Sequence, residues 1–293
     1  MLNLKFPMAN LITGSTGFLG KQVLSHFVKE AYEIISPGRD EIKTKLVSCR
    51  NIDLLIHAAG KAHSTKKTKE EAKAFFDVNF DLTKKITEII DQKKIEINTF
   101  VFISTVAVYG LEEGLDINEG TELNGNSPYA QSKKMAEEHL QKWAKEIGVN
   151  LVILRLPLIF GENAPGNLGA MERAVKGRYY FQIGEGEAKR SMVHAKQLAE
   201  FLPTLIGKSG IYHLTDGEHN SYNEVAQYFA KKHNRRIINV PYMPIVLLAK
   251  LGNVIPKFPL NSYRLAKLNQ TLTFNDERAR KELGWNGTNA LEV

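Results

Sequence analysis

Tyr129 and Lys133 lie four residues apart, a spacing that could support proton transfer. Side chains four apart on a helix share one face. An ammonium within about 4–6 Å of a phenol favours the phenolate and lowers its pKa from about 10 toward neutral pH. Such a pair could take a proton from a substrate hydroxyl or give one to a carbonyl. The alternative is structural, because a lysine can also run along an apolar helix face with its amine in water.

A helix must present this pair, and the sequence predicts where that helix begins. Ser127 is a suitable N-cap, and Pro128 suits the first helical position. The expected inward stripe consists of Tyr129, Lys133, Ala136, Leu140, Trp143 and Ile147. We expect Leu140, Trp143 and Ile147 to lie in the core. An enzymatic interpretation also requires the Tyr129 oxygen to face a cleft and Lys133 to stay out of bulk water.

A glycine turn follows the first apolar strand and precedes a helical pattern. Its glycines are Gly14, Gly17 and Gly20. Glycines allow the backbone to approach a pyrophosphate, while the positive end of the following helix faces its negative charge. The order of strand, turn and helix predicts dinucleotide binding by Gly14, Thr16, Gly17, Phe18, Leu19 and Gly20. Glycines that serve only helix–strand packing are the alternative.

The spacing of the three glycines after Thr13, together with Tyr129-x-x-x-Lys133, resembles the NAD-dependent epimerase/dehydratase family of extended short-chain dehydrogenase/reductases. The resemblance extends from Ala9 to about Trp285. It implies a nicotinamide cofactor that exchanges hydride with the substrate while Tyr129 transfers the proton. It also implies that Lys133 holds the nicotinamide ribose, that the substrate is a nucleotide sugar, and that the chain forms a homodimer.

The same resemblance assigns roles after two further apolar runs. The catalytic hydroxyl falls on Thr105, with Ser104 as the alternative and as a substrate contact. The sugar 4,6-dehydratases of the family carry Asp-Glu directly afterwards, whereas this chain has Val106 and Ala107, which transfer no protons and argue against dehydration. The run His57-Ala58-Ala59-Gly60 implies cofactor contacts at Ala58, Ala59 and Gly60, with His57 as a structural residue.

The choice between NAD and NADP depends on the end of the second predicted strand. Ser36 and Arg39 lie there, and a hydroxyl followed by a guanidinium suits a 2′-phosphate, so NADP(H) is slightly favoured. Asp40 leaves NAD open. Family members usually have another strand between this point and Asp53, and the interval is short here. Either that strand is missing or the turn is rebuilt.

Substrate contacts in the second half also follow from the resemblance. It assigns Asn167 and Arg190 to substrate binding, and the planar guanidinium of Arg190 suits phosphate oxygens. His63 and Ser64 are further candidates near the cofactor loop. The apolar region 244–268 is expected to be a cap over the substrate or a subunit contact.

Short apolar runs alternate with amphipathic segments through the first half of the chain. This predicts an α/β fold, a Rossmann-type doubly wound parallel sheet with a smaller C-terminal α/β substrate domain. We expect the dinucleotide-binding domain at residues 1–160 and the substrate domain at 161–293, with segments near 190–215 packing back on the first domain.

Composition excludes several classes of protein. The chain has 293 residues, 43% of them hydrophobic, and a net charge of +7. Its single cysteine, Cys49, excludes an internal disulfide and a cysteine-rich zinc site, so we expect no metal and a cytoplasmic location. Basic residues are scattered in pairs, which argues against nucleic acid binding. No run approaches the roughly 20 apolar residues that span a bilayer, so no membrane partner is expected.

These observations favour an NAD(P)-dependent oxidoreductase that acts on a nucleotide sugar. The stretch from Pro157 to Met171 resembles UDP-4-keto-6-deoxy-hexosamine reductases, which favours reduction of a 4-keto group. A nucleotide-sugar 4-epimerase with tightly bound NAD is the near alternative. A non-catalytic dinucleotide-binding sensor is the second alternative, although such a protein is expected to lose Tyr129 or Lys133.

Overall fold

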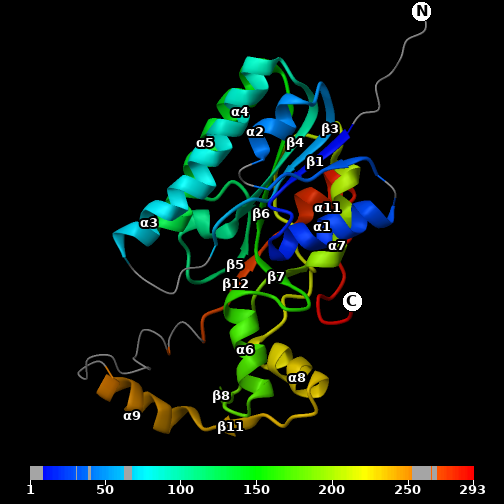
Figure 1. The fold of residues 1–293 in the computed structure, drawn as a ribbon. Coiled ribbons are helices and arrows are strands. Elements are labelled where there is room, and N and C mark those ends of the chain that lie inside the picture. The colour runs from blue at the N-terminus through cyan, green and yellow to red at the C-terminus, as the bar shows by residue number, and fades with distance from the viewer. Residues whose placement is uncertain (1–8, 31, 39–40, 63–67, 253–264, 266–268) are drawn as a thin grey trace, which may run out of the picture.

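A six-stranded parallel sheet forms the centre of the molecule, with strand order β10-β6-β4-β3-β1-β2 (Figure 1). The structure is a computed structural model that describes residues 9–30, 32–38, 41–62, 68–252, 265 and 269–293. The strands of this sheet are β1 (Ala9–Thr13), β2 (Ile34–Ile35), β3 (Asn51–His57), β4 (Glu96–Thr105), β6 (Asn150–Leu156) and β10 (Gly210–Tyr212). The predicted Rossmann-type fold is confirmed.

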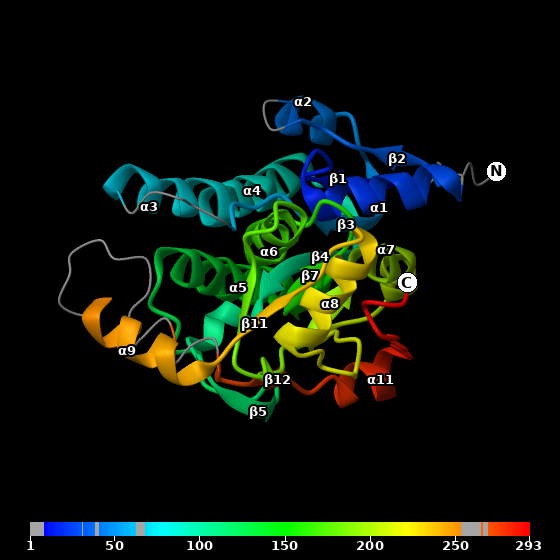
Figure 2. The same cartoon turned by 90° about the horizontal axis from the view of Figure 1, so that it is seen from below.

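Helices cover both faces of the sheet (Figures 1 and 2). One face carries α1 (Phe18–Lys29), α7 (Ala195–Phe201) and α11 (Glu277–Leu283); the other carries α2 (Ile42–Val47), α4 (Leu82–Lys93) and α5 (Pro128–Ile147). Successive strand residues supply the two cores in turn, since Leu11 packs on the α4–α5 side and Ile12 on the α1 side. Both faces of the sheet are therefore buried, which explains the continuous apolar strands.

The strand expected between Ser36 and Asp53 is missing from the described residues of that interval. They form α2 instead, and β2 is the edge strand of the sheet. Because β1 lies between β2 and β3, the strand order reverses there, and the carboxyl ends of β1 and β3 flank the crevice in which such sheets bind ligands.

Three small sheets and several helices make up the rest of the described chain. The sheets pair β5 (Gly114–Ile117) with β12 (Leu272–Phe274), β7 (Leu158–Phe160) with β9 (Met192–His194), and β8 (Phe181–Ile183) with β11 (Ile238–Val240). The helices are α3 (Lys69–Phe76), α6 (Gly166–Lys176), α8 (Tyr222–Lys232) and α9 (Tyr242–Gly252). A separate apolar cluster around Phe160, Leu168 and Phe229 holds α6 and α8 together at the lower end in Figure 1. The domain boundary at residue 160 stays a prediction.

Two sequence expectations concern apolar surface. Of the region 244–268, α9 contains the first part, and residues 253–264 and 266–268 lie outside the described residues. In the described part of the chain, no helix combines the length and the apolar composition that crossing a bilayer requires. Ile147 was expected in the core but is 44% exposed, because it is the last residue of α5 and lies beyond the packed stripe.

Candidate active site

The glycine turn brings two chain segments into close contact at the carboxyl ends of β1 and β3. Gly14 has a φ of +76°, and a Cβ atom there would lie 2.4 Å from the backbone nitrogen of Ala59. A Cβ atom on Gly20 would lie 2.0 Å from the Gly14 carbonyl oxygen. Both positions therefore need glycine.

The N-terminus of α1 is open beside this turn. Gly17 is its N-cap, no side chain caps the helix, and no acidic residue lies in its first turn. Thr16 is exposed, Phe18 is half-buried, and Leu19 packs in the core. Free backbone N–H groups at the positive end of a helix form a cradle with the chemistry that binds a diphosphate.

The loop after β3 lies between the glycine turn and α5. Ala58 and Ala59 are half-buried. A Cβ atom on Gly60 would lie 3.2 Å from both the Lys133 Nζ and the Asn79 Oδ1. The loop thus connects the diphosphate cradle with the predicted catalytic lysine.

Helix α5 presents Tyr129 and Lys133 as the sequence predicts. The Ser127 hydroxyl accepts a hydrogen bond from the backbone N–H of Ala130, 3.1 Å away, and Pro128 occupies the first turn, so the predicted helix start is confirmed. Lys133 is only 5% exposed, and its Nζ donates to the Ile103 carbonyl at 2.8 Å. The ammonium lies 4.5 Å from the centre of the Phe102 ring. Lys133 therefore points inward against the end of β4.

Thr105 and Tyr129 meet at the carboxyl end of β4. Thr105 is the last residue of the strand, and its hydroxyl accepts a hydrogen bond from the Ala107 N–H at 3.2 Å. The Thr105 side chain lies close enough to the Tyr129 phenol to lower its pKa. The half-buried Tyr129 ring also packs 5.8 Å from the Phe75 ring.

The pKa of Tyr129 is nevertheless raised, because burial outweighs the effect of Thr105. The expectation of a lowered pKa was therefore wrong for the protein alone. Burial acts on the neighbouring amine as well and lowers the pKa of Lys133 to about 8, while the carboxylate of Glu137 opposes this shift. Desolvation disfavours both charged forms, an effect that helical spacing does not report.

Ser104 points away from Tyr129. It is 4% exposed, and its hydroxyl donates to Glu137 Oε1. Glu137 in turn forms a buried ion pair with Arg155, with 2.8 Å between Oε2 and Nη2. Thr105, rather than Ser104, is the hydroxyl that the structure brings together with Tyr129.

His57 and Asn79 form the scaffold beneath the lysine. The Thr13 hydroxyl lies 2.6 Å from His57 Nδ1, and the Thr83 hydroxyl lies 2.9 Å from Nε2. Burial lowers the pKa of His57 to about 3, so the ring is neutral. Asn79 lies in a π-helical turn (Asp77–Asp81) and binds the Lys61 backbone and the Ser132 hydroxyl. His57 is structural, as the sequence predicts.

The remaining candidates lie apart from this cluster or outside the described residues. Ser36 is half-buried directly after β2. Arg39, Asp40, His63 and Ser64 are not among the described residues. Asn167 is exposed in the first turn of α6. Arg190 is 8% exposed, and its Nε donates to the Tyr222 hydroxyl at 3.1 Å, with the guanidinium 5.5 Å from the same ring.

Sequence reasoning missed Glu137. The sequence did contain a signal for it: Glu137 is an acidic residue one helical turn after Lys133, beside the apolar positions Ala136 and Leu140. The partner that satisfies it, Arg155, comes from β6 and could not be paired with it by local spacing.

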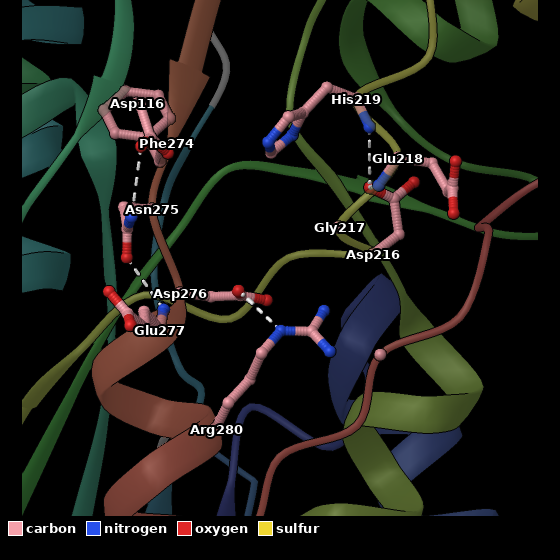
Figure 3. Close-up of a pocket in the computed structure, with 11 residues that line it drawn as sticks. Asp116, Asp216, Gly217, Glu218, His219, Phe274, Asn275, Asp276, Glu277 and Arg280 are labelled. Carbon is pink, nitrogen blue, oxygen red and sulfur yellow. Dashed lines mark hydrogen bonds and ion pairs between the residues drawn. The ribbon is translucent and has the colours of Figure 1, made fainter.

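A cavity of about 470 Å³ lies elsewhere, between β5, β12 and the start of α11 (Figure 3). Its polar side chains are largely paired with one another, for example Arg280 with Asp276 at 2.8 Å and Asn275 with Asp116 at 3.2 Å. None of the predicted site residues that the structure describes lines it. Among the described residues, no group of three or more histidine, cysteine, aspartate or glutamate side chains is placed to hold a metal ion.

Comparison with known proteins identifies the family. A model of the NAD dependent epimerase/dehydratase family matches residues 10–214. The chain is 25% identical to the decarboxylating sterol-4-alpha-carboxylate 3-dehydrogenase of Dictyostelium discoideum, with 94% of each protein covered. It is 24% identical to the UDP-glucose 4-epimerase of Vibrio cholerae, with 98% of this chain and 93% of that protein covered.

A solved structure agrees with the fold. The structure of RMD from Pseudomonas aeruginosa complexed with NADPH superposes with a TM-score of 0.73 at 17% identity, covering 97% of this chain and 96% of that one. The family match spans the glycine turn, Thr105, Tyr129 and Lys133. The chain therefore belongs to the NAD dependent epimerase/dehydratase family and is an enzyme of the extended short-chain dehydrogenase/reductase type.

Proposed function

We propose that this enzyme reduces the 4-keto group of a nucleotide sugar, of the UDP-4-keto-6-deoxy-hexosamine type, with a nicotinamide cofactor. The observation that carries the proposal is the cluster of Thr105, Tyr129 and the inward-pointing Lys133 at the carboxyl end of β4. The glycine turn and the open N-terminus of α1 lie at the same edge of the sheet. Reduction of a carbonyl needs this combination of a proton donor and a dinucleotide site.

The proposed cofactor site lies at the same edge of the sheet, at the carboxyl ends of its strands. Gly14, Gly17 and Gly20, with the N–H groups of α1, would hold the diphosphate, and Lys133 with the Ala58–Gly60 loop would hold the nicotinamide ribose. When bound, the reduced nicotinamide supplies the hydride. Ser36 would lie beside the adenosine ribose, where a hydroxyl in place of a carboxylate leaves room for a 2′-phosphate. We therefore propose NADP(H) ahead of NAD.

Tyr129 would donate the proton to the C4 oxygen, and Thr105 would hydrogen-bond that oxygen. Burial raises the pKa of Tyr129, so its phenol stays protonated at neutral pH, which is the form that a ketone reduction needs. In the opposite direction the phenolate must form, and a positively charged nicotinamide would favour it.

Dehydration is not part of the proposal. Val106 and Ala107 occupy the positions after Thr105 and begin a 3-10 helix (Val106–Tyr109). Neither side chain can accept or donate a proton, whereas elimination of water needs both an acid and a base.

A nucleotide-sugar 4-epimerase is the second candidate. The similarity to the UDP-glucose 4-epimerase of Vibrio cholerae favours it. The same tyrosine, lysine and hydroxyl would serve, but hydride would leave and return on opposite faces of the sugar, and NAD would stay bound throughout.

The two candidates are separated by incubating the enzyme with NADPH and a panel of nucleotide 4-ketosugars while following the absorbance of the reduced nicotinamide. We expect NADPH consumption with one of them, and about a 10²–10⁴-fold slower rate in Tyr129→Phe. No consumption with any ketosugar, together with NAD retained after purification, favours the epimerase. Unchanged turnover in Tyr129→Phe contradicts the assigned proton donor.

A further inference from the structure

Glu137 is a fully buried carboxylate that the proposed chemistry does not use. It lies one helical turn after Lys133 on α5 and is 0% exposed. Arg155 binds it through two nitrogens, with Nε at 3.0 Å and Nη2 at 2.8 Å from Oε2. The second partner of this carboxylate is the Ser104 hydroxyl. A carboxylate is buried in this way only where hydrogen bonds and an opposite charge compensate it, because removing its water costs free energy.

Three consecutive residues of β4 bind three positions of the same face of α5. The Ile103 carbonyl accepts from Lys133 at 2.8 Å, the Ser104 hydroxyl donates to Glu137, and the Thr105 side chain lies close enough to the Tyr129 phenol to lower its pKa. Because the middle contact lies between the two catalytic ones along the strand, it fixes the last residues of β4 against the helix.

Arg155 is itself held from the far side. Its Nη1 donates to the Tyr109 hydroxyl and to the Glu119 carbonyl, both at 3.1 Å. The Tyr109 hydroxyl lies 2.6 Å from His213 Nε2. The guanidinium therefore cannot move away from Glu137 without breaking its contacts to Tyr109, after β4, and to Glu119, after β5.

We propose that Glu137 is a positioning residue of the active site, which fastens the end of β4 to α5 through Ser104 and serves as the counter-charge of the buried Lys133 ammonium, while Arg155 holds it in place. The role rests on the proposed function, because it concerns the same lysine.

Few charged groups among the described residues face Lys133. The groups that the packed elements present to it are His57 from β3, Gly60 from the following loop, Asn79 from the π-helical turn, Phe102 and Ile103 from β4, and Glu137 from α5. Of these groups His57 is neutral, and Glu137 is the carboxylate that acts on Lys133. Burial lowers the pKa of Lys133 to about 8 and Glu137 opposes that shift, so loss of the carboxylate should lower this pKa further.

The test is an NMR titration of the full-length protein labelled with ¹³C at the lysine ε-carbons, in which the Lys133 signal is assigned by its absence in Lys133→Met. We expect a midpoint near 8 in the wild type. In Glu137→Gln the midpoint should fall by about one pH unit or more. Glu137→Gln leaves the Arg155 guanidinium buried without a carboxylate partner, which destabilises the fold strongly. The deciding variant is therefore the double replacement Glu137→Leu with Arg155→Met, which removes both charges at similar volume.

Ser104→Ala is the matched control, since it removes the contact to β4 but keeps both charges. We expect its Lys133 midpoint to equal that of the wild type. If the double variant titrates at the wild-type midpoint, Glu137 is not the counter-charge of Lys133. The same conclusion follows if Ser104→Ala shifts the Lys133 midpoint as much as the double variant does, because the titration would then report a change in packing. The titration uses no substrate or cofactor, so its result is independent of whether the enzyme reduces a ketosugar.

Discussion

At the scale of single residues, the buried, neutral His57 should make the stability of the folded protein sensitive to acid. Its pKa is about 3 in the folded protein, against about 6.5 in an unfolded chain. Between these values the unfolded state binds a proton that the folded state does not, so stability is full above about pH 6.5 and falls by about 1.4 kcal/mol per pH unit below it. We expect urea unfolding of the wild type to lose stability between pH 7 and pH 5 more steeply than that of His57→Gln. Other histidines contribute to both proteins alike, so parallel pH dependences would assign the sensitivity elsewhere.

At the scale of elements, the glycine turn depends on the contact between β1–α1 and the loop after β3. Gly14 and Gly148 both have a φ of +76°, but a Cβ atom on Gly148, the C-cap of α5, would meet nothing within 4 Å. Gly148→Ala should therefore cost only the left-handed backbone strain, about 1–2 kcal/mol, and leave binding of the nicotinamide cofactor unchanged. Gly14→Ala adds a backbone clash, so this variant should unfold at a lower temperature and bind the nicotinamide cofactor at least about tenfold more weakly, a loss of about 1.4 kcal/mol. Fluorescence titration with NADPH and thermal unfolding measure both, and equal effects of the two replacements would contradict the close contact.

Elements also show what could be predicted from the sequence. The glycine turn and the start of α5 at Ser127 were predictable, because turns and caps depend on neighbouring residues. The contacts of Ser104 with Glu137 and of Glu137 with Arg155 were not, since they join β4, α5 and β6 across the sheet. The direction of the Tyr129 pKa shift was missed for the same reason, because burial is a tertiary property.

At the scale of the whole molecule, the two tryptophans report on opposite faces of one sheet. Trp143 of α5 packs in the core beside α4, and its indole N–H donates to Asp91 at 2.9 Å. Trp285, just after α11, packs in the core beside α1 and α7, 4.9 Å from the Phe201 ring. The second core is thus completed by residues far along the chain, beyond the smaller sheets. Since both cores share the same strands, neither should persist without the other.

We therefore expect the two faces of the sheet to unfold in a single transition. In Trp143→Phe the remaining fluorescence reports the α1 face, and in Trp285→Phe it reports the α5 face. Within each variant, the urea transition followed by tryptophan fluorescence should coincide with that followed by far-ultraviolet circular dichroism, whatever the replacement costs in stability. If the Trp285 signal changed at lower urea than the circular dichroism, the C-terminal segment would detach before the sheet unfolds. The strands would then be stable without it, contrary to a core that α11 and Trp285 complete.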